Sequence, residues 1–159
     1  MRREFAKFIT EIVRKDNKVL LINMDGPGYG IFDKLRSENP NNYLNSGVTE
    51  QASTGMAAGM ALEGLKPYIY SITPFVLERP FEQIKLDIVE QKANVKLVGF
   101  WNYANAGPTH RPRDIKVLCK LLGISLYEPK NSDEARRLLL ETYKDNKPAF
   151  FHLTKDPES

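Results

Sequence analysis

The chain has 159 residues, a length typical of one compact domain, and its hydrophobic fraction of 42% is sufficient for a buried core. It carries 23 Lys and Arg against 20 Asp and Glu, and this mixed net charge of +3 argues against a nucleic-acid-binding or anionic-membrane-binding surface. No apolar run is long enough to cross a bilayer, and the first residues lack the apolar core of a signal peptide. The one cysteine, Cys119, excludes an internal disulfide, so we expect a cytoplasmic protein.

Short apolar runs alternate along the chain with segments of helical periodicity. The expected strands are 19–22, 43–44, 68–72, 95–101, 125–127 and 149–153. The expected helices are 5–13, 31–35, 50–65, 75–91, 114–122 and 132–143, the last capped by Ser132. Helices between successive strands imply right-handed crossovers, and hence an α/β fold of three α/β/α layers with a mostly parallel, doubly wound sheet. With no linker long enough to divide the chain, residues 1–159 are expected to form one domain.

A glycine-rich turn, with Gly26, Gly28 and Gly30, follows the first expected strand and precedes a helix. A dinucleotide-binding fingerprint belongs at such a place, but its third glycine would occupy the position of Ile31. A phosphate-binding lysine motif is also missing from this turn. We therefore interpret the turn as a flexible connection rather than a phosphate site.

The segment 45–64 combines an acidic residue with a helix of small residues. Glu50 lies where a loop enters the helix, and Gly55 and Gly59 follow on one ridge. As structural residues, Glu50 would favour the helix dipole, and the glycines would permit tight helix packing. A functional carboxylate beside a close-packed helix is the alternative interpretation.

Two further segments place polar or aromatic residues at the ends of strands. Phe75 lies at a strand-to-helix junction, the rim where open sheets bind ligands, although a core aromatic explains its position equally well. A sharp Gly-Pro turn carries His110, whose imidazole can exchange protons near neutral pH. His152 lies within the last expected strand, which favours a packed or surface histidine. Two histidines and one cysteine at unrelated spacings argue against a zinc site.

Three segments in this order resemble a known family. They are Gly-Val-Thr-Glu-Gln at 47–51, the small-residue helix and turn at 55–67, and Gly-Pro-Thr-His at 107–110. Together they are similar to the pyrimidine-binding domain of the thiamine-diphosphate-dependent transketolase family, and the resemblance covers nearly the whole chain. It implies the thiamine-diphosphate-binding fold. It also implies an enzyme that cleaves a bond beside a ketone or 2-oxo acid and transfers the fragment.

The resemblance assigns roles to the residues that would surround the cofactor. Glu50 corresponds to the carboxylate that holds N1′ of the aminopyrimidine and favours its imino tautomer, whose 4′ nitrogen removes the proton on C2 of the thiazolium ring. Phe75 corresponds to the aromatic residue that stacks on the pyrimidine. Tyr70 and Ile72 are expected to form further walls of this cofactor-binding site.

The resemblance also assigns residues to catalysis and substrate binding. His110 corresponds to the histidine near C2, where it assists proton transfer and contacts the substrate. Arg79 and Arg111 are expected to face a carboxylate or phosphate of the substrate. Ala106 stands where ketose-phosphate transketolases usually carry an acid before this histidine turn, which predicts a different donor specificity. The segment 73–79 is one residue longer than the family pattern.

The family holds the diphosphate through Mg²⁺ on a separate domain with a Gly-Asp-Gly motif, which this sequence does not contain. The resemblance therefore implies a split enzyme in which a partner subunit supplies the Mg²⁺ ligands, and it places no metal ligand on this chain. The helix with Gly55 and Gly59 would form the contact with that subunit or with a second copy of this chain, within a heterotetramer. A split 2-oxo acid decarboxylase and a non-catalytic assembly module of the same fold are the alternatives.

Overall fold

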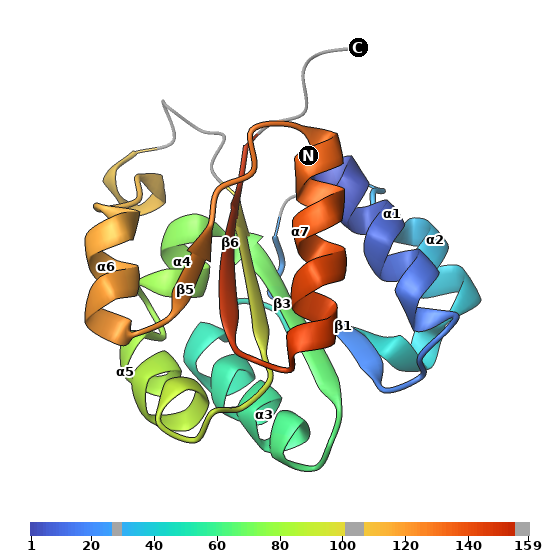
Figure 1. The fold of residues 1–159 in the computed structure, drawn as a ribbon, viewed down its shortest axis with the longest axis horizontal. Coiled ribbons are helices and arrows are strands. Elements are labelled where there is room, and N and C mark those ends of the chain that lie inside the picture. Colours follow the sequence, from blue (N-terminus) through green and yellow to red (C-terminus); the bar gives the residue numbers. More distant parts are fainter. Residues whose placement is uncertain (27–29, 101–106, 155–159) are drawn as a thin grey trace.

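The computed structural model describes residues 1–26, 30–100 and 107–154 and contains a six-stranded sheet (Figure 1). The strands are β1 (Val19–Asn23), β2 (Tyr43–Asn45), β3 (Lys66–Ile72), β4 (Lys96–Phe100), β5 (Ser125–Tyr127) and β6 (Ala149–Leu153). Their order across the sheet is β2-β1-β3-β4-β6-β5, and every neighbouring pair is parallel. The predicted α/β fold with a doubly wound sheet is confirmed.

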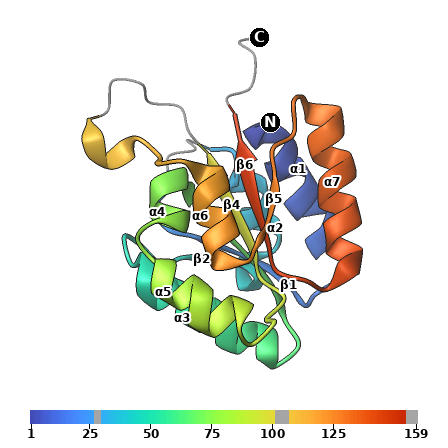
Figure 2. The same cartoon turned by 60° about the vertical axis from the view of Figure 1, so that its left-hand side comes forward.

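Helices cover both faces of the sheet, which gives the three expected layers (Figure 2). One layer consists of α1 (Arg2–Val13), α2 (Asp33–Glu38) and α7 (Ser132–Asp145). The other consists of α3 (Glu50–Leu62), α4 (Thr73–Leu77), α5 (Phe81–Gln83), the π-helical turn η2 (Ile84–Val89) and α6 (Ile115–Leu122). Two 3-10 turns complete the described elements: η1 (Pro40–Asn42) and η3 (Pro108–His110).

Each face of the sheet has its own apolar core because successive side chains of a strand point to opposite faces. Along β3, Tyr68 and Tyr70 belong to the core under α1, whereas Ile69 belongs to the core under α3. The first core is rich in aromatic rings: Tyr70 stacks between Phe5, at 5.7 Å, and Phe100, at 5.0 Å between ring centroids. The apolar strand runs of the sequence therefore fill two layers, as a parallel sheet requires.

Two sequence predictions differ from the structure by more than small shifts in where an element begins or ends. The helix expected over 75–91 is interrupted after Leu77, because Pro80 has no N–H to continue the hydrogen bonding and its ring clashes with the preceding turn. The prediction that Ser132 caps the last helix is wrong: the Asn131 side chain accepts a hydrogen bond from Glu134 N, and Ser132 is the first helical residue. Gly28, Trp101 and Ala106 lie outside the described residues.

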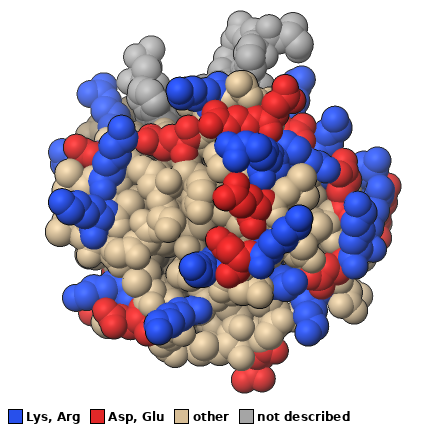
Figure 3. Space-filling view, in the orientation of Figure 1, with Lys and Arg blue, Asp and Glu red and all other residues tan. Residues whose placement is uncertain are grey.

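Because all strands run in parallel, their carboxyl ends meet at one edge of the sheet, and α3, α4 and η3 all begin just beyond that edge. Lys and Arg side chains are interspersed with Asp and Glu over the face in Figure 3, as the mixed charge of the sequence suggests. Within the described ranges, each helix is too short or too polar to span a bilayer.

Candidate active site

Glu50 is the first residue of α3 and is buried, with only 7% of its side chain exposed. The loop before it turns sharply at Gly47, whose φ of 69° favours glycine, and Thr49 Oγ1 donates a hydrogen bond to Ser46 O. This turn directs the carboxylate inward, where its Oε1 accepts a hydrogen bond from Arg79 Nη1 at 2.7 Å. A buried carboxylate paired with a cation is therefore the first component of the site.

Arg79 connects Glu50 to Phe75. Phe75 lies in α4, and Arg79 follows it by four residues, a separation that brings two side chains together on one side of a helical turn. The guanidinium carbon of Arg79 is 3.7 Å from the centroid of the Phe75 ring, a cation–π contact. Glu50 and Phe75, which belong to different elements, thus share one arginine.

His110 reaches the same cluster from the loop after β4. Gly107, with a φ of 84°, starts the turn η3, and the rings of His110 and Phe75 meet edge to face with centroids 5.0 Å apart. His110 Nδ1 lies 3.0 Å from Thr109 Oγ1, which orients the imidazole. Phe75 and His110, which the sequence places at the ends of two strands, therefore lie together, whereas the catalytic and binding roles stay predictions.

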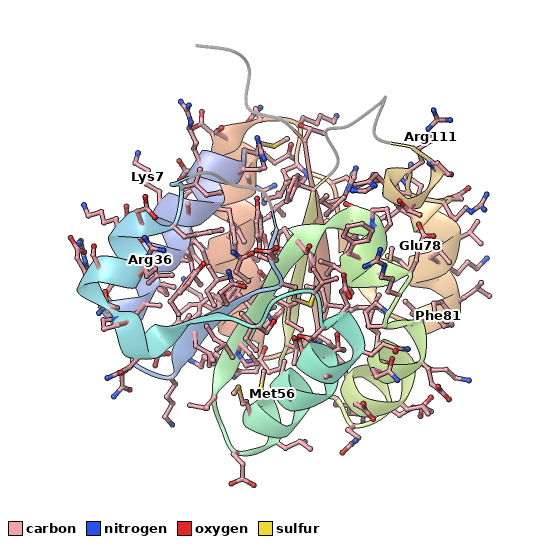
Figure 4. The ribbon with its side chains drawn as sticks, turned by 180° about the vertical axis from the view of Figure 1, so that it is seen from behind. Lys7, Arg36, Met56, Glu78, Phe81 and Arg111 are labelled. Atoms are coloured by element: carbon pink, nitrogen blue, oxygen red, sulfur yellow. The ribbon has the colours of Figure 1, made fainter. Side chains whose placement is uncertain are left out.

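The other predicted residues lie at different depths. Tyr70 and Ile72 belong to the core under α1, where Tyr70 is stacked between Phe5 and Phe100, whereas α3 packs on the opposite face of the sheet. Their role as walls of a cofactor site stays a prediction. Arg111 is exposed at the end of η3, on the same side of the molecule as Glu78 (Figure 4).

Glu78 is a residue of this region that sequence reasoning missed. Its Oε1 accepts a hydrogen bond from Arg113 N at 2.8 Å, which ties the end of α4 to the loop that follows His110. Nothing in the sequence pattern indicates this contact, because it joins positions 35 residues apart through a loop-to-helix approach. The hydrogen bond helps to hold η3 against Phe75.

A second contact that the sequence did not predict joins the start of α4 to the sheet. Thr73, its first residue, has its Oγ1 2.9 Å from His152 Nδ1 on β6. Burial lowers the pKa of His152, and the charge of Glu128 opposes this effect. The sequence placed His152 correctly in the last strand, but only the strand order shows which helix it supports.

A family model described as "Transketolase, pyrimidine binding domain" matches residues 1–157. The chain belongs to this family. The pyrimidine-binding domain is also 28% identical over 142 residues to a protein named as one of the subunits of the apulose-4-phosphate transketolase of Phocaeicola vulgatus, covering 87% of this chain and 46% of that protein. It is 24% identical to a 6-deoxy-6-sulfo-D-fructose transketolase subunit of a Clostridium species, covering 99% of this chain and 50% of the relative.

Solved structures agree on the fold of this pyrimidine-binding domain. A structure described as a split gene transketolase, inactive beta4 tetramer, superimposes with a TM-score of 0.86 at 22% identity and covers 99% of this chain and 52% of the other. The chain thus spans about half the length of these relatives. Membership of the family implies thiamine diphosphate as the cofactor whose pyrimidine such a domain binds.

The residues of the domain fit the aminopyrimidine half of that cofactor. The planar, nitrogen-bearing guanidinium of Arg79 lies on Phe75 and donates to Glu50, so this pair accommodates a flat group that stacks and bonds through nitrogen. Among the residues described, His, Cys, Asp and Glu side chains form no group of three or more that could hold a metal ion.

Proposed function

We propose that this chain is the pyrimidine-binding subunit of a split, thiamine-diphosphate-dependent transketolase. The observation that carries the proposal is the buried Glu50 carboxylate at the start of α3. Arg79 contacts both this carboxylate and the Phe75 ring, so the two groups lie close together. A carboxylate is rarely buried without a functional role or a charged partner, because removing its charge from water costs several kcal/mol of free energy. An acid beside a stacking ring is what recognition of an aminopyrimidine requires.

When bound, thiamine diphosphate supplies the electron sink for cleavage of a carbon–carbon bond beside a ketone or 2-oxo acid. The chain's own residues hold and move protons. Glu50 keeps a proton at N1′ of the pyrimidine in surroundings that exclude water, and Phe75 orients the ring by stacking. His110, whose ring touches Phe75, acts as an acid or base at a substrate oxygen. We assign to Arg79 and Arg111 the pairing with an anionic group of the substrate.

We assign the Mg²⁺ and diphosphate site to a partner subunit with a Gly-Asp-Gly motif. The two transketolase relatives are named as subunits, and the similar solved structure is named as a split gene product in a tetramer, which supports a divided enzyme. A homodimer of this chain within a heterotetramer, and a cytoplasmic location, belong to the same proposal.

The proposal is tested by Glu50→Gln in the complex with the diphosphate-binding partner. We expect exchange of the cofactor's C2 proton, followed by NMR in D₂O, to slow by about 10²-fold or more, the contribution typical of a positioned acid or base. Glu63→Gln, an exposed change at the other end of α3, is the matched control and should leave exchange unchanged. Exchange at the wild-type rate in the Glu50→Gln complex, with cofactor bound, would remove Glu50 from this role.

A further inference from the structure

We infer that Arg79 occupies the place of the aminopyrimidine ring in the cofactor-free chain, so that Arg79 and the cofactor compete for the same two contacts. The inference rests on the proposed function, which supplies the ligand. It adds a second role for Arg79, because the sequence assigns this residue only to the substrate. It also means that the pyrimidine site is closed until the arginine leaves.

The geometry of Arg79 carries the argument. One guanidinium makes both contacts, with Nη1 2.7 Å from Glu50 Oε1 and its carbon 3.7 Å from the centroid of the Phe75 ring. A guanidinium is planar, delocalised and cationic, so it stacks on aromatic faces and donates to carboxylates at the same time. A pyrimidine that stacks on this face of Phe75 and bonds to Glu50 Oε1 needs the same space, so it and the guanidinium exclude each other.

The contact also has a reason to exist in the absence of cofactor. Only 7% of the Glu50 side chain is exposed, and a buried carboxylate without a partner is strongly destabilising. Arg79 supplies that partner while the pyrimidine is missing. The arginine thus preserves a functional acid in a folded chain that has no ligand.

Arg79 is well suited to leave when the cofactor arrives. It lies beyond the end of α4 and directly before Pro80, and 42% of its side chain is exposed, so its departure opens no hole in either apolar core. Phe75 and Glu50 stay fixed by α4 and α3. The exchange therefore moves one flexible side chain and leaves the elements of the site in place.

The test measures binding of 4-amino-5-hydroxymethyl-2-methylpyrimidine, the ring half of the cofactor, to the full chain by ligand-observed NMR. If Arg79 closes the site in nine molecules out of ten, Arg79→Gln tightens binding about tenfold, since apparent affinity scales with the fraction of open sites. Arg79→Lys, which keeps the charge but loses the planar group, should fall between the wild type and Arg79→Gln. Arg113→Gln removes a positive charge from the neighbouring loop and should bind as the wild type does.

A second readout follows the arginine itself. In the wild type, the ¹⁵N resonances of the Arg79 guanidinium should move when the pyrimidine is added and should remain unmoved in Glu50→Gln, which lacks the acid that binds the ring. Equal or weaker pyrimidine binding by Arg79→Gln, together with loss of binding in Glu50→Gln, would overturn the inference and leave the proposed function standing. Absence of pyrimidine binding in the wild type and in every variant would overturn both.

Discussion

Single side chains set the chemistry of this site, and each is held by a contact outside its own element. Glu50 is buried against Arg79, His110 packs its ring on Phe75, and Arg79 serves both Glu50 and Phe75. The free-energy effects of substitutions at such residues are not additive. The effect of one substitution includes the cost of leaving its partner without the contact. The contribution of a contact is therefore measured best by comparing two single variants with the double variant of the same contact.

His152 gives a prediction at the residue scale, because burial lowers its pKa below the ordinary 6.5 and Glu128 only partly opposes this. Between these two pKa values the unfolded chain binds more protons than the folded one, so stability falls as the pH falls below about 6.5. We expect His152→Gln, whose amide can still bond to Thr73, to remove this part of the pH dependence. The free energy of unfolding in urea at pH 7.5, 6.5 and 5.5 measures it, and an identical decline in both proteins would contradict the prediction.

At this scale the family resemblance predicted roles for Glu50, Phe75 and His110, and these roles stay predictions. The sequence missed Glu78 and the contact of Thr73 with His152. Those contacts join residues 35 and 79 positions apart, and no local pattern carries such information. Tyr70 was placed correctly on a strand, but alternation along β3 turned its ring into the aromatic core under α1.

The short helix α4 is the element on which the site depends. It carries Phe75, is followed at once by Glu78 and Arg79, and packs so closely on β4 that position 99 has room only for glycine. A Cβ at Gly99 would lie 2.7 Å from Thr73 Oγ1 and 2.9 Å from the Phe150 ring. The interruption at Pro80 keeps α4 short and separates it from the packing of α5 and η2 on α3.

Two glycine substitutions test how closely α4 packs on β4 and how open the outer side of α3 is. Gly99→Ala should destabilise the chain by about 1–3 kcal/mol, since β4 or α4 must shift to admit the methyl group. Gly59→Ala, at a helical position where no described atom beyond the adjoining backbone of α3 and the two chain neighbours lies within 4 Å of the added Cβ, should stabilise it by about 0.5–1 kcal/mol. Denaturant unfolding of the two variants and the wild type measures these changes in the free energy of unfolding. Gly99→Ala with the stability of the wild type or higher would mean that α4 and β4 are less closely packed than described.

At the scale of the whole molecule, α3 leaves two large apolar side chains exposed to water in the isolated chain. Met56 is 38% exposed and Leu62 55% exposed, and the small residue Gly59 lies between them in the sequence. The relatives named as subunits are about twice as long as this chain. Both side chains lie on the helix that begins with Glu50.

Met56→Glu should therefore weaken association with the partner subunit or with a second copy, and leave the free energy of unfolding of the isolated chain nearly unchanged. Leu121→Glu on α6, at a site 68% exposed, is the matched control with the same change of chemistry. Sedimentation velocity of each variant, alone and with the partner, measures the association. Wild-type association of Met56→Glu with loss in Leu121→Glu would move the interface from α3 to α6.

The sequence by itself determined the α/β class, the six strands and the residues that resemble a family motif, because hydrophobic periodicity and short motifs are local properties. It also placed Phe75 and His110 at the ends of strands, the rim where open sheets bind ligands. Only the tertiary structure decided that Arg79 bridges Glu50 and Phe75, that Pro80 ends α4, and which side chains hold the loop of His110. These contacts arise from segments distant in the chain, and their geometry exists only once both cores have packed the helices against the sheet.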